Sequence, residues 1–219
     1  MNRAPLSQTA EDYLKAIYKL QVEQGKATTS ALAERVGVSA PSATAMLKKL
    51  AAMGLVEHEP YRGVLLTSAG EKAAIEVIRH HRLLEQYLSE TLGMPIDELH
   101  AEADRLEHAL SEELEARIDK SLGYPTHDPH GDPIPDANLK LPAGSERALA
   151  DLAQGERATV SRVPDVDTEL LRYLSSLSLL PGADVKLVTS APFGGPVTVL
   201  SGGSEHAIAR ELALQIGVR

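Results

Sequence analysis

One segment near the N-terminus constrains the fold more than any other, because two short helices and a hairpin follow one another there. Residues 29–36 have helical periodicity and end at Gly37, whose missing Cβ suits a tight turn. The stretch VSAPSATAMLKKLAAMG then begins a second helix, with Ser39 as its N-cap and Pro41 in its first turn. The stretch LVEHEPYRGVLLT predicts a strand, a turn and a second strand. A helix-turn-helix followed directly by a hairpin is typical of a winged-helix DNA-binding domain, although a packed helical hairpin is the simpler alternative.

The distribution of charge agrees with this assignment. The chain has 219 residues and a formal net charge of −9. Residues 1–72 carry nine Lys and Arg against seven Asp and Glu, whereas residues 73–219 carry thirteen against twenty-four. A basic surface favours phosphate contacts, so the first third is the part that we expect to bind DNA. The acidic remainder is better suited to binding cations.

Composition excludes several other classes. The chain has no Cys, which excludes disulfides, thiolate zinc sites and Cys nucleophiles and leaves any metal to nitrogen and oxygen ligands. No apolar run approaches the ~20 residues needed to span a bilayer, and the N-terminus has no signal-peptide pattern. We therefore predict a cytoplasmic protein with no membrane partner.

The middle of the chain holds two long helical patterns, over residues 68–92 and 97–122. In the second pattern, apolar residues recur every three or four positions: Leu99, Ala103, Leu106, Leu110, Leu114 and Ile118. A long amphipathic helix outside a DNA-binding unit most often buries its apolar stripe against a second copy. The pattern therefore predicts a homodimer, which also suits DNA binding at two half-sites.

The rest of the chain changes in character. Residues 123–145 form a Pro/Gly-rich connector, in which His127, Asp128, His130 and Asp132 are more typical of a solvated loop than of a metal site. From residue 146 onward, short β-rich runs alternate with Gly and Pro, and one helix interrupts them at 167–179. We predict a mainly α chain with a small all-β domain. Its parts are a winged helix-turn-helix domain (1–72), a helical metal-binding and dimerisation domain (73–142) and an SH3-like barrel (143–219).

Several potential metal ligands share helix faces. At about 100° per residue, one ridge of the predicted helix 97–122 carries His100, Asp104, Glu107 and His108 beside the apolar stripe. On the preceding helix, His81 and Glu85 are four residues apart and share a face. Each set alone is also explained by an ordinary charged helix surface.

Taken together, these segments resemble one known family. The order EDYLKAIYKL, SAPSATAMLKKLAAMGLVEHEPYRGVLLTSAG, HHRLLEQYL, HAEADRLEHALSEELEARI and GDPIP resembles the diphtheria toxin repressor and manganese transport regulator family of metal-dependent transcriptional repressors. The resemblance covers residues 8–136 and continues more loosely into the C-terminal part. That part is similar to the SH3-like domain of the family and to ferrous-transport accessory (FeoA) domains.

The resemblance implies two metal sites. The primary, regulatory site would be formed by Asp12, Asp104, Glu107 and His108. The ancillary site would be formed by His81, Glu85, His100 and Asp167. A further family ligand in the SH3-like domain falls near Leu170, which cannot bind metal, so Glu169 is the substitute that we consider. One manganese subgroup uses an extra Glu where this chain has Lys15, which argues against a two-metal cluster of that form.

The donor atoms favour one metal. Iron-responsive members of the family have Met and Cys where this chain has Asp12 and Asp104, and hard carboxylates favour Mn²⁺ over softer ions. We therefore predict a Mn²⁺-responsive repressor that binds operator DNA when metal is bound and controls metal-ion homeostasis genes; Fe²⁺ or another divalent transition metal is the alternative. The side chains that we expect at the DNA are Ser39, Pro41, Ser42 and Thr44 in the groove, with Lys48 and Arg62 near phosphate.

Two other functions are considered. A winged-helix regulator of a small organic ligand would need an apolar or aromatic cavity, yet the chain has one Phe and no Trp. A metalloenzyme would need an open coordination position and a substrate cleft, and no nucleophile motif or phosphate loop accompanies these ligands. We therefore predict neither an enzyme nor a small-molecule substrate.

Overall fold

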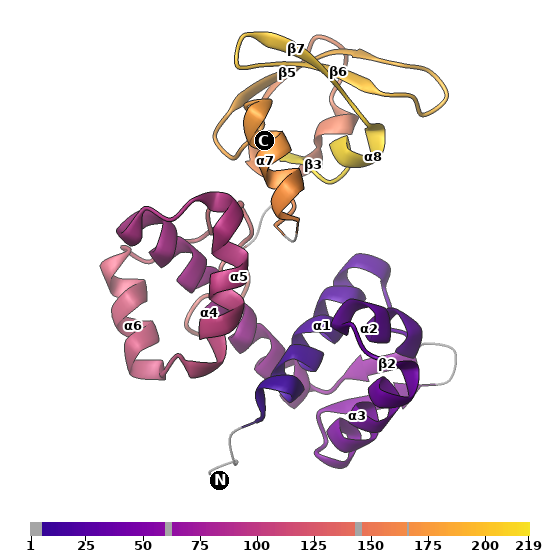
Figure 1. Ribbon diagram of the computed structural model, residues 1–219, viewed down its shortest axis with the longest axis vertical. Helices are drawn as coiled ribbons and strands as arrows, with labels where there is room; N and C mark the ends of the chain where they lie inside the picture. The colour runs from indigo at the N-terminus through magenta and orange to yellow at the C-terminus, as the bar shows by residue number, and fades with distance from the viewer. Residues whose placement is uncertain (1–5, 60–62, 143–145, 166) are drawn as a thin grey trace. The chain divides into compact units, whose positions relative to one another are not determined.

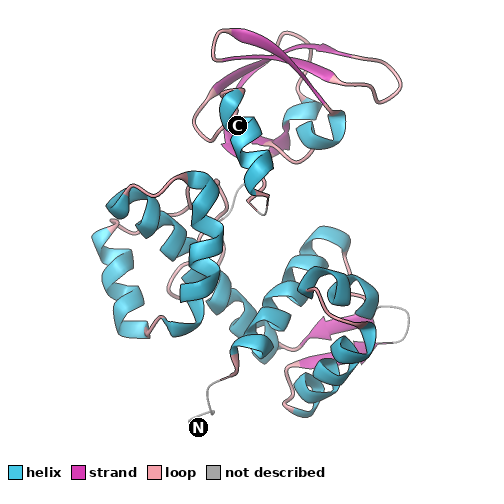
Figure 2. Ribbon diagram, in the orientation of Figure 1, coloured by secondary structure: helices cyan, strands magenta, loops and turns pink. Residues whose placement is uncertain are grey.

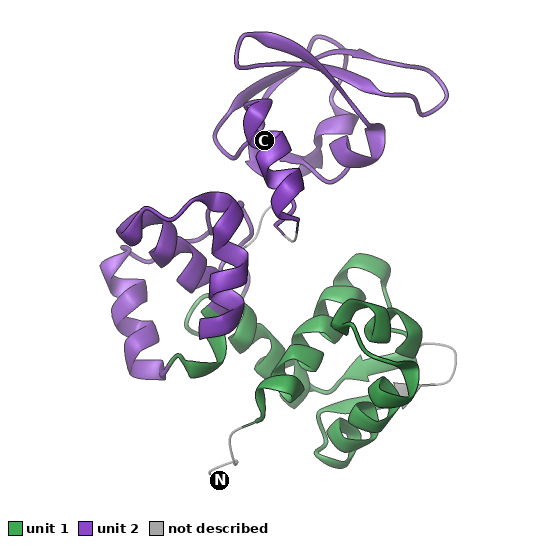
Figure 3. Cartoon of the chain, in the orientation of Figure 1, with its two compact units in different colours: residues 1–80, 107–110, 135–140 green, residues 81–106, 111–134, 141–219 purple. Residues whose placement is uncertain are grey.

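The computed structural model describes residues 6–59, 63–142, 146–165 and 167–219 (Figure 1). The chain divides into two compact units (Figure 3). Unit 1 comprises residues 1–80, 107–110 and 135–140, and unit 2 comprises residues 81–106, 111–134 and 141–219.

Unit 1 contains the predicted helix-turn-helix. Its elements are α1 (Gln8–Gln24), α2 (Thr29–Val36), α3 (Ala40–Ala52), β1 (Val56–Glu59), β2 (Gly63–Leu66), the first half of α4 (Ser68–Leu92) and the 3-10 turn η1 (Glu107–Ala109). The Ser39 side chain accepts a hydrogen bond from the backbone N–H of Ser42 at the start of α3, and Gly37 ends α2 in the left-handed conformation. Gly37 thus ends the first helix and Ser39 begins the second, as predicted from the sequence. The helix-turn-helix prediction is confirmed.

The hairpin behind α3 is also present. Strands β1 and β2 pair antiparallel, with Val56 opposite Leu66. Gly63 opens β2 with a φ of 83°, and a Cβ there would lie 2.4 Å from the carbonyl oxygen of Ala27. The next residue, Val64, donates its backbone N–H to the same carbonyl at 2.9 Å. The hairpin is thereby tied to the α1–α2 connection. Arg62, a predicted phosphate contact, lies outside the described residues.

The core of unit 1 comes from the apolar faces of α1, α2 and α3. Its fully buried side chains include Leu14, Ile17, Leu32, Leu50 and Leu55. Helix α3 buries Ala43 and Leu50, whereas Met53, which follows the helix, is 37% exposed. The three helices α1, α2 and α3 thus share one hydrophobic core.

In unit 2, the long helix predicted over residues 97–122 does not exist as one element. It is split into α5 (Ile96–Leu106), the turn η1 of unit 1, and α6 (Glu112–Ser121). Ser111 starts α6 as its N-cap by accepting a hydrogen bond from the backbone N–H of Leu114. The apolar stripe is therefore interrupted: Leu99 is buried, whereas Leu114 is 49% exposed.

The C-terminal part of unit 2 is the predicted small β domain (Figure 2). Its elements are β3 (Arg147–Ala148), η2 (Leu149–Asp151), β4 (Arg157–Arg162), α7 (Thr168–Ser176), β5 (Asp184–Ser190), β6 (Val197–Ser201), β7 (Ser204–Ile208), α8 (Arg210–Ala213) and β8 (Gly217–Val218). The sheet has the order β3-β8-β4-β5-β6-β7. The segment HAIAREL is divided between a strand and a helix, since β7 ends at Ile208 and α8 begins at Arg210.

Candidate metal centres and DNA-binding surface

Unit 1 brings together three of the four residues predicted for the primary site. Asp12 lies near the start of α1, and Glu107 and His108 lie on η1. His108 Nε2 is 2.9 Å from Asp12 Oδ1 and 3.5 Å from Glu107 Oε1. One ligand atom from each residue can thus meet within 4.8 Å of the others, as metal coordination requires. We call Asp12, Glu107 and His108 the primary cluster.

A lysine neutralises part of the primary cluster. Lys15 Nζ donates to both carboxylate oxygens of Glu107, at 3.0 and 2.8 Å. Both side chains are almost fully buried, at 11% and 1% exposure. A buried carboxylate needs a compensating charge, so Lys15 accounts for the burial of Glu107. Lys15 is recognisable in the sequence only as a departure from the family motif, and its pairing with Glu107 was not predicted.

The electrostatics of Asp12 differ from those of Glu107. Asp12 has a side chain that is 47% exposed. Burial raises the pKa of the Asp12 carboxyl above its ordinary value, and the charge of His108 acts in the opposite direction. Proximity to the Glu107 carboxylate also raises this pKa. A cation at the cluster would relieve this like-charge repulsion.

The fourth residue predicted for the primary site lies in the other unit. Asp104 is on α5, where its Oδ1 is 3.2 Å from His81 Nδ1 and its Oδ2 is 3.5 Å from His100 Nε2. Within unit 2, Asp104 therefore contacts two residues of the predicted ancillary site. Its membership in the primary site stays a prediction.

The predicted ancillary residues of α4 and α5 converge in unit 2. His81 Nε2 lies 3.1 Å from Glu85 Oε1 and 3.1 Å from His100 Nδ1. His100 Nδ1 is also 3.5 Å from Glu85 Oε1 and 3.5 Å from Asp165 Oδ2. Glu85 is fully buried and stands at the centre of the group.

The connector contributes two residues that the sequence analysis assigned to a solvated loop. That assignment holds for His127, which is exposed, and is wrong for Asp128 and His130, which are 6% and 0% exposed. Asp128 Oδ1 accepts from the backbone N–H groups of His130 and Asp132, both at 2.9 Å, and folds the connector inward. His130 Nδ1 then lies 3.6 Å from Glu85 Oε2. The Asp-Pro-His-Gly order is the local signal of this turn, because Gly131 has a φ of 92° and no room for a Cβ.

The group around Glu85 has polar atoms without hydrogen-bond partners. Among the described residues, these buried atoms are Glu85 Oε1 and Oε2, Asp128 Oδ2 and His130 Nδ1. Buried polar atoms are normally satisfied, so an orphaned set of two carboxylates and an imidazole fits a bound cation. We use the name ancillary cluster for the residues His81, Glu85, His100, Asp128, His130 and Asp165.

The pKa values of the ancillary cluster are strongly shifted. Burial raises the pKa of Asp128 well above its ordinary value, and the neighbouring Glu85 carboxylate adds to this effect. Burial acts against the charged form of Glu85 as well, but the imidazoles of His100, His130 and His81 outweigh it and hold the pKa of Glu85 well below its usual range. His130 has a pKa raised to about 9, because its contact with Glu85 outweighs the effect of burial. The protonated His130 thus supplies positive charge next to the buried Glu85 carboxylate.

Asp167, the ligand predicted from the SH3-like domain, lies at the start of α7. It is the N-cap of α7, and its Oδ1 accepts from the backbone N–H groups of Glu169 and Leu170 at 2.9 and 3.1 Å. Asp165, two residues earlier, is the acidic residue that reaches His100. The substitute Glu169 is exposed on α7. Asp167 stays a predicted ligand of the ancillary site, and Asp165 is a second candidate from the same domain.

The predicted groove residues lie along one exposed face at the start of α3. Ser39 Oγ and Ser42 Oγ are 2.9 Å apart, and Thr44 Oγ1 donates to the carbonyl oxygen of Ala40 at 2.9 Å. Pro41 and Lys48 are exposed on the same helix. The exposed side chains are small and polar near the N-terminus of α3, and basic further along the helix.

Comparison with known proteins decides the family. Three family descriptions match: "Iron dependent repressor, N-terminal DNA binding domain" at residues 5–64, "Iron dependent repressor, metal binding and dimerisation domain" at 67–136, and "FeoA domain" at 147–219. The iron-dependent repressor IdeR of Mycobacterium tuberculosis (strain ATCC 25618 / H37Rv) is 34% identical over 236 residues, which covers 97% of each chain. The diphtheria toxin repressor of Corynebacterium efficiens is 33% identical, covering 97% of this chain and 96% of the relative. The chain belongs to the iron-dependent repressor family.

Solved structures of the family agree with this assignment. A manganese-dependent transcriptional repressor in complex with manganese has a TM-score of 0.87 and 41% identity, covering 95% of this chain and 98% of that one. The manganese regulator SloR has a TM-score of 0.81 and 33% identity, covering 99% of both chains. The relatives found by sequence include proteins named for iron, and the similar solved structures include proteins named for manganese.

Family membership confirms the coarse function. The chain is a metal-dependent transcriptional repressor, with a DNA-binding domain, a metal-binding and dimerisation domain and a FeoA domain. It is not an enzyme, which excludes the metalloenzyme alternative. Among the described helices, even the longest lacks an apolar stretch of the length and hydropathy needed to cross a bilayer.

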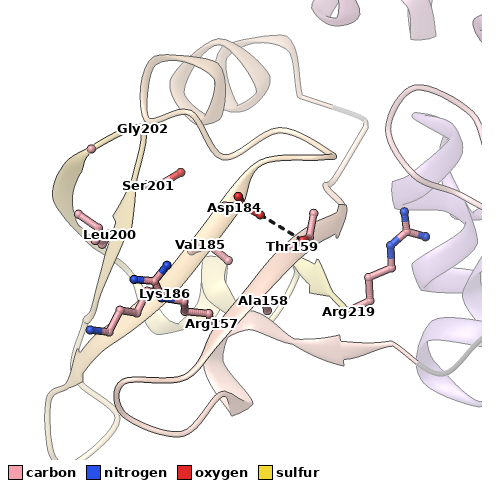
Figure 4. A pocket seen from close by; sticks show the side chains of 11 residues that line it. Arg157, Ala158, Thr159, Asp184, Val185, Lys186, Leu200, Ser201, Gly202 and Arg219 are labelled. Atoms are coloured by element: carbon pink, nitrogen blue, oxygen red, sulfur yellow. Dashed lines mark hydrogen bonds between the residues drawn. The ribbon is translucent and has the colours of Figure 1, made fainter.

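The FeoA domain also contains a cavity. It has a volume of about 550 Å³ and is lined by residues of β4, β5 and β6, among them Arg157, Thr159, Asp184 and Lys186 (Figure 4). Thr159 Oγ1 donates to Asp184 Oδ1 at 3.3 Å across its wall. No residue of the primary or ancillary cluster lines this cavity.

Proposed function

We propose that the chain is a Mn²⁺-responsive repressor that binds operator DNA as a homodimer in the cytoplasm and controls metal-homeostasis genes. The donor set of the primary cluster carries the proposal: it offers carboxylate oxygen and imidazole nitrogen and no sulfur. Hard oxygen ligands suit Mn²⁺, although Fe²⁺ and Zn²⁺ also bind such sites. The family members named for manganese add support, and those named for iron make Fe²⁺ the alternative.

The primary cluster is placed to control the DNA-binding helix. Asp12 is followed on α1 by the buried residues Tyr13, Leu14 and Ile17, so the first turns of α1 belong to the core of the winged helix. α1 packs on α2, and α2 packs on α3. A change that fixes the start of α1 against η1 is thereby passed to α3 through packed side chains.

The charge of the cluster explains why a cation is needed. Lys15 donates to both carboxylate oxygens of Glu107, whereas the pKa of Asp12 is raised by burial and by the nearby Glu107 carboxylate. A bound divalent cation supplies the missing positive charge and stabilises the state in which Asp12, Glu107 and His108 converge. We retain Asp104 as the fourth proposed ligand.

The proposed DNA contacts follow from the exposed face of α3. Ser39, Pro41, Ser42 and Thr44 face the groove, and Lys48 lies near phosphate, with Arg62 proposed from the sequence alone. Small side chains of this kind give limited direct base readout, so DNA shape contributes to specificity. Two α3 helices in a homodimer then bind two half-sites.

The experiment is a metal titration of DNA affinity. A duplex selected from a random pool by the full chain in Mn²⁺ is labelled, and its fluorescence anisotropy is followed with Mn²⁺, anaerobic Fe²⁺ and Zn²⁺ separately. We expect saturating binding with Mn²⁺ and none with chelator. DNA affinity that does not depend on any of these metals would overturn the proposal, and activation by Fe²⁺ without activation by Mn²⁺ would establish the alternative. Glu205→Ala, which changes an exposed carboxylate on β7, is the matched control.

A further inference from the structure

Glu11, the neighbour of Asp12 on α1, touches the primary cluster but is not one of its proposed ligands. Glu11 Oε2 lies 2.6 Å from His108 Nδ1. Because an ionised carboxylate can only accept, Glu11 accepts a hydrogen bond here when Nδ1 carries the proton. The side chain of His108 is 5% exposed and that of Glu11 is 23% exposed. A mostly buried imidazole is thus held at one edge by Glu11 and at the other by Asp12.

The two edges of the ring favour different proton positions. With the proton on Nδ1, the Nε2 lone pair faces Asp12 Oδ1 at 2.9 Å and Glu107 Oε1 at 3.5 Å, where a cation would bind. With the proton on Nε2, the ring donates to Asp12, and the nitrogen that would bind a cation is blocked. Asp12 alone therefore favours the blocked form, and Glu11 favours the form that can bind metal.

We propose that Glu11 is a positioning residue that holds His108 as the Nδ1–H tautomer, with Nε2 available to a divalent cation. This rests on the proposed function, since it gives a role to a neighbour of the same metal site. The position of Glu11 in the first turn of α1 offers a rival explanation, because an acid there also interacts favourably with the helix dipole. A dipole role affects the stability of α1 and leaves the tautomer of His108 unchanged.

The tautomer is measured directly in the metal-free chain. Long-range ¹H–¹⁵N correlation spectra, recorded at a pH where the ring is neutral, distinguish Nδ1–H from Nε2–H. We expect His108 to be Nδ1–H in the natural chain and in Asp12→Ala, and to change to Nε2–H in Glu11→Ala. Glu11→Gln, whose amide oxygen still accepts, keeps the Nδ1–H form in part. An Nε2–H tautomer in the natural chain, or an unchanged tautomer in Glu11→Ala, overturns the proposal.

Metal affinity is measured at the same ring. Mn²⁺ is paramagnetic and broadens the signals of nearby nuclei, so all variants are compared in a Glu85→Gln background, which weakens the ancillary cluster. A titration in competition with a chelator then reports binding near His108. We expect Glu11→Ala to weaken Mn²⁺ binding by about 10–100-fold, the usual cost of losing a residue that orients a ligand, and Glu11→Gln to weaken it less. Glu23→Gln, an exposed acid on the same helix, is the control and should not change the affinity.

The variants separate the two proposals. If Asp12→Ala weakens Mn²⁺ binding and Glu11→Ala does not, the positioning role of Glu11 is wrong and the metal site stands. If Asp12→Ala leaves the broadening of His108 unchanged, the primary cluster is not a metal site and both proposals fail.

Discussion

The primary and ancillary clusters use the same kinds of side chain and balance their buried charge differently. In the primary cluster, the buried carboxylate of Glu107 has its own lysine, and Asp12 is half exposed. In the ancillary cluster, Glu85 and Asp128 are both buried, and their neighbours include His81, His100 and His130. In the primary cluster, a lysine donates directly to the buried Glu107 carboxylate. In the ancillary cluster, Arg82 lies 3.7 Å from Asp128 Oδ2, and the positive charge next to Glu85 comes from protons on histidine or from a metal ion.

This difference suggests a division of labour. A site whose buried carboxylate is already compensated folds without metal and can respond to changes in metal concentration. A site whose buried polar atoms lack hydrogen-bond partners gains more from a cation, because the cation satisfies atoms that are otherwise orphaned. We therefore expect the primary cluster to control DNA binding and the ancillary cluster to control stability.

The largest expected effect tests the permanent charge of the primary cluster. Lys15→Met leaves Glu107 buried without its lysine, which should lower the free energy of unfolding of the metal-free chain by about 3–5 kcal/mol. Mn²⁺ should recover part of this loss, because a cation replaces the missing charge. Urea unfolding with chelator and with Mn²⁺ measures both effects. Lys15→Arg keeps the charge and serves as the control. If Lys15→Met without metal has the same free energy of unfolding as the natural chain, the Lys15–Glu107 pair is not needed for stability.

The second prediction concerns the stability that metal adds through the ancillary cluster. At a Mn²⁺ concentration 100 times the dissociation constant, binding to the folded state alone adds about 2.7 kcal/mol. Glu85→Gln should remove most of the resulting rise in Tm, because Glu85 contacts His81, His100 and His130 at once. Asp12→Ala should retain most of it. Equal losses in the two variants, measured by thermal unfolding, would remove the proposed division between the clusters.

The third prediction is a pH dependence that belongs to the ancillary cluster. The folded-state pKa of His130 is about 9, above the ordinary 6.5, so its contribution to stability is complete below pH 6.5 and is lost as the pH rises through 9. The metal-free chain should therefore lose stability across this window. A metal that binds His130 must displace its proton, so Mn²⁺ affinity should rise over the same range, by at most about tenfold per pH unit. His130→Gln should flatten both profiles in calorimetric titrations; an unchanged slope would place the titrating group elsewhere.

The smallest expected effect concerns the choice of metal at the primary cluster. Asp12→Met replaces a hard oxygen with a soft sulfur, so the ratio of Mn²⁺ to Fe²⁺ affinity should fall, on the order of tenfold. Asp12→Asn keeps an oxygen donor without the charge and separates the effect of softness from that of charge. Anaerobic competition titrations measure the ratio. If Asp12→Met and Asp12→Asn change it equally, charge rather than ligand type decides the preference.

The winged helix was predictable because its signals are local. The N-cap Ser39, the terminal Gly37 and the periodicity of the helices all act within a few residues of their own positions. The break between α5 and α6 was missed because the apolar spacing continues through it. Ser111 followed by acidic residues is the capping signal that marks the break.

The metal clusters were predictable only in part. The family resemblance supplied Asp12, Glu107 and His108, which the structure brings together. Lys15 pairs with a residue 92 positions away, and such long-range contacts leave no trace in local pattern. Asp128 and His130 were assigned to a solvated loop because polar residues between prolines are usually exposed. Their burial follows from a turn that only the folded chain shows.

The most direct test of the account is the Mn²⁺ dependence of DNA affinity in Asp104→Ala, compared with the natural chain and with Glu205→Ala. We predict that Mn²⁺ strengthens DNA binding of the natural chain and of Glu205→Ala. In Asp104→Ala this gain should fall by more than about 100-fold, since the loss of a residue that merely orients a ligand costs 10–100-fold. The dimer should persist in all three chains by analytical ultracentrifugation. Mn²⁺-stimulated DNA binding of natural strength in Asp104→Ala would contradict the account.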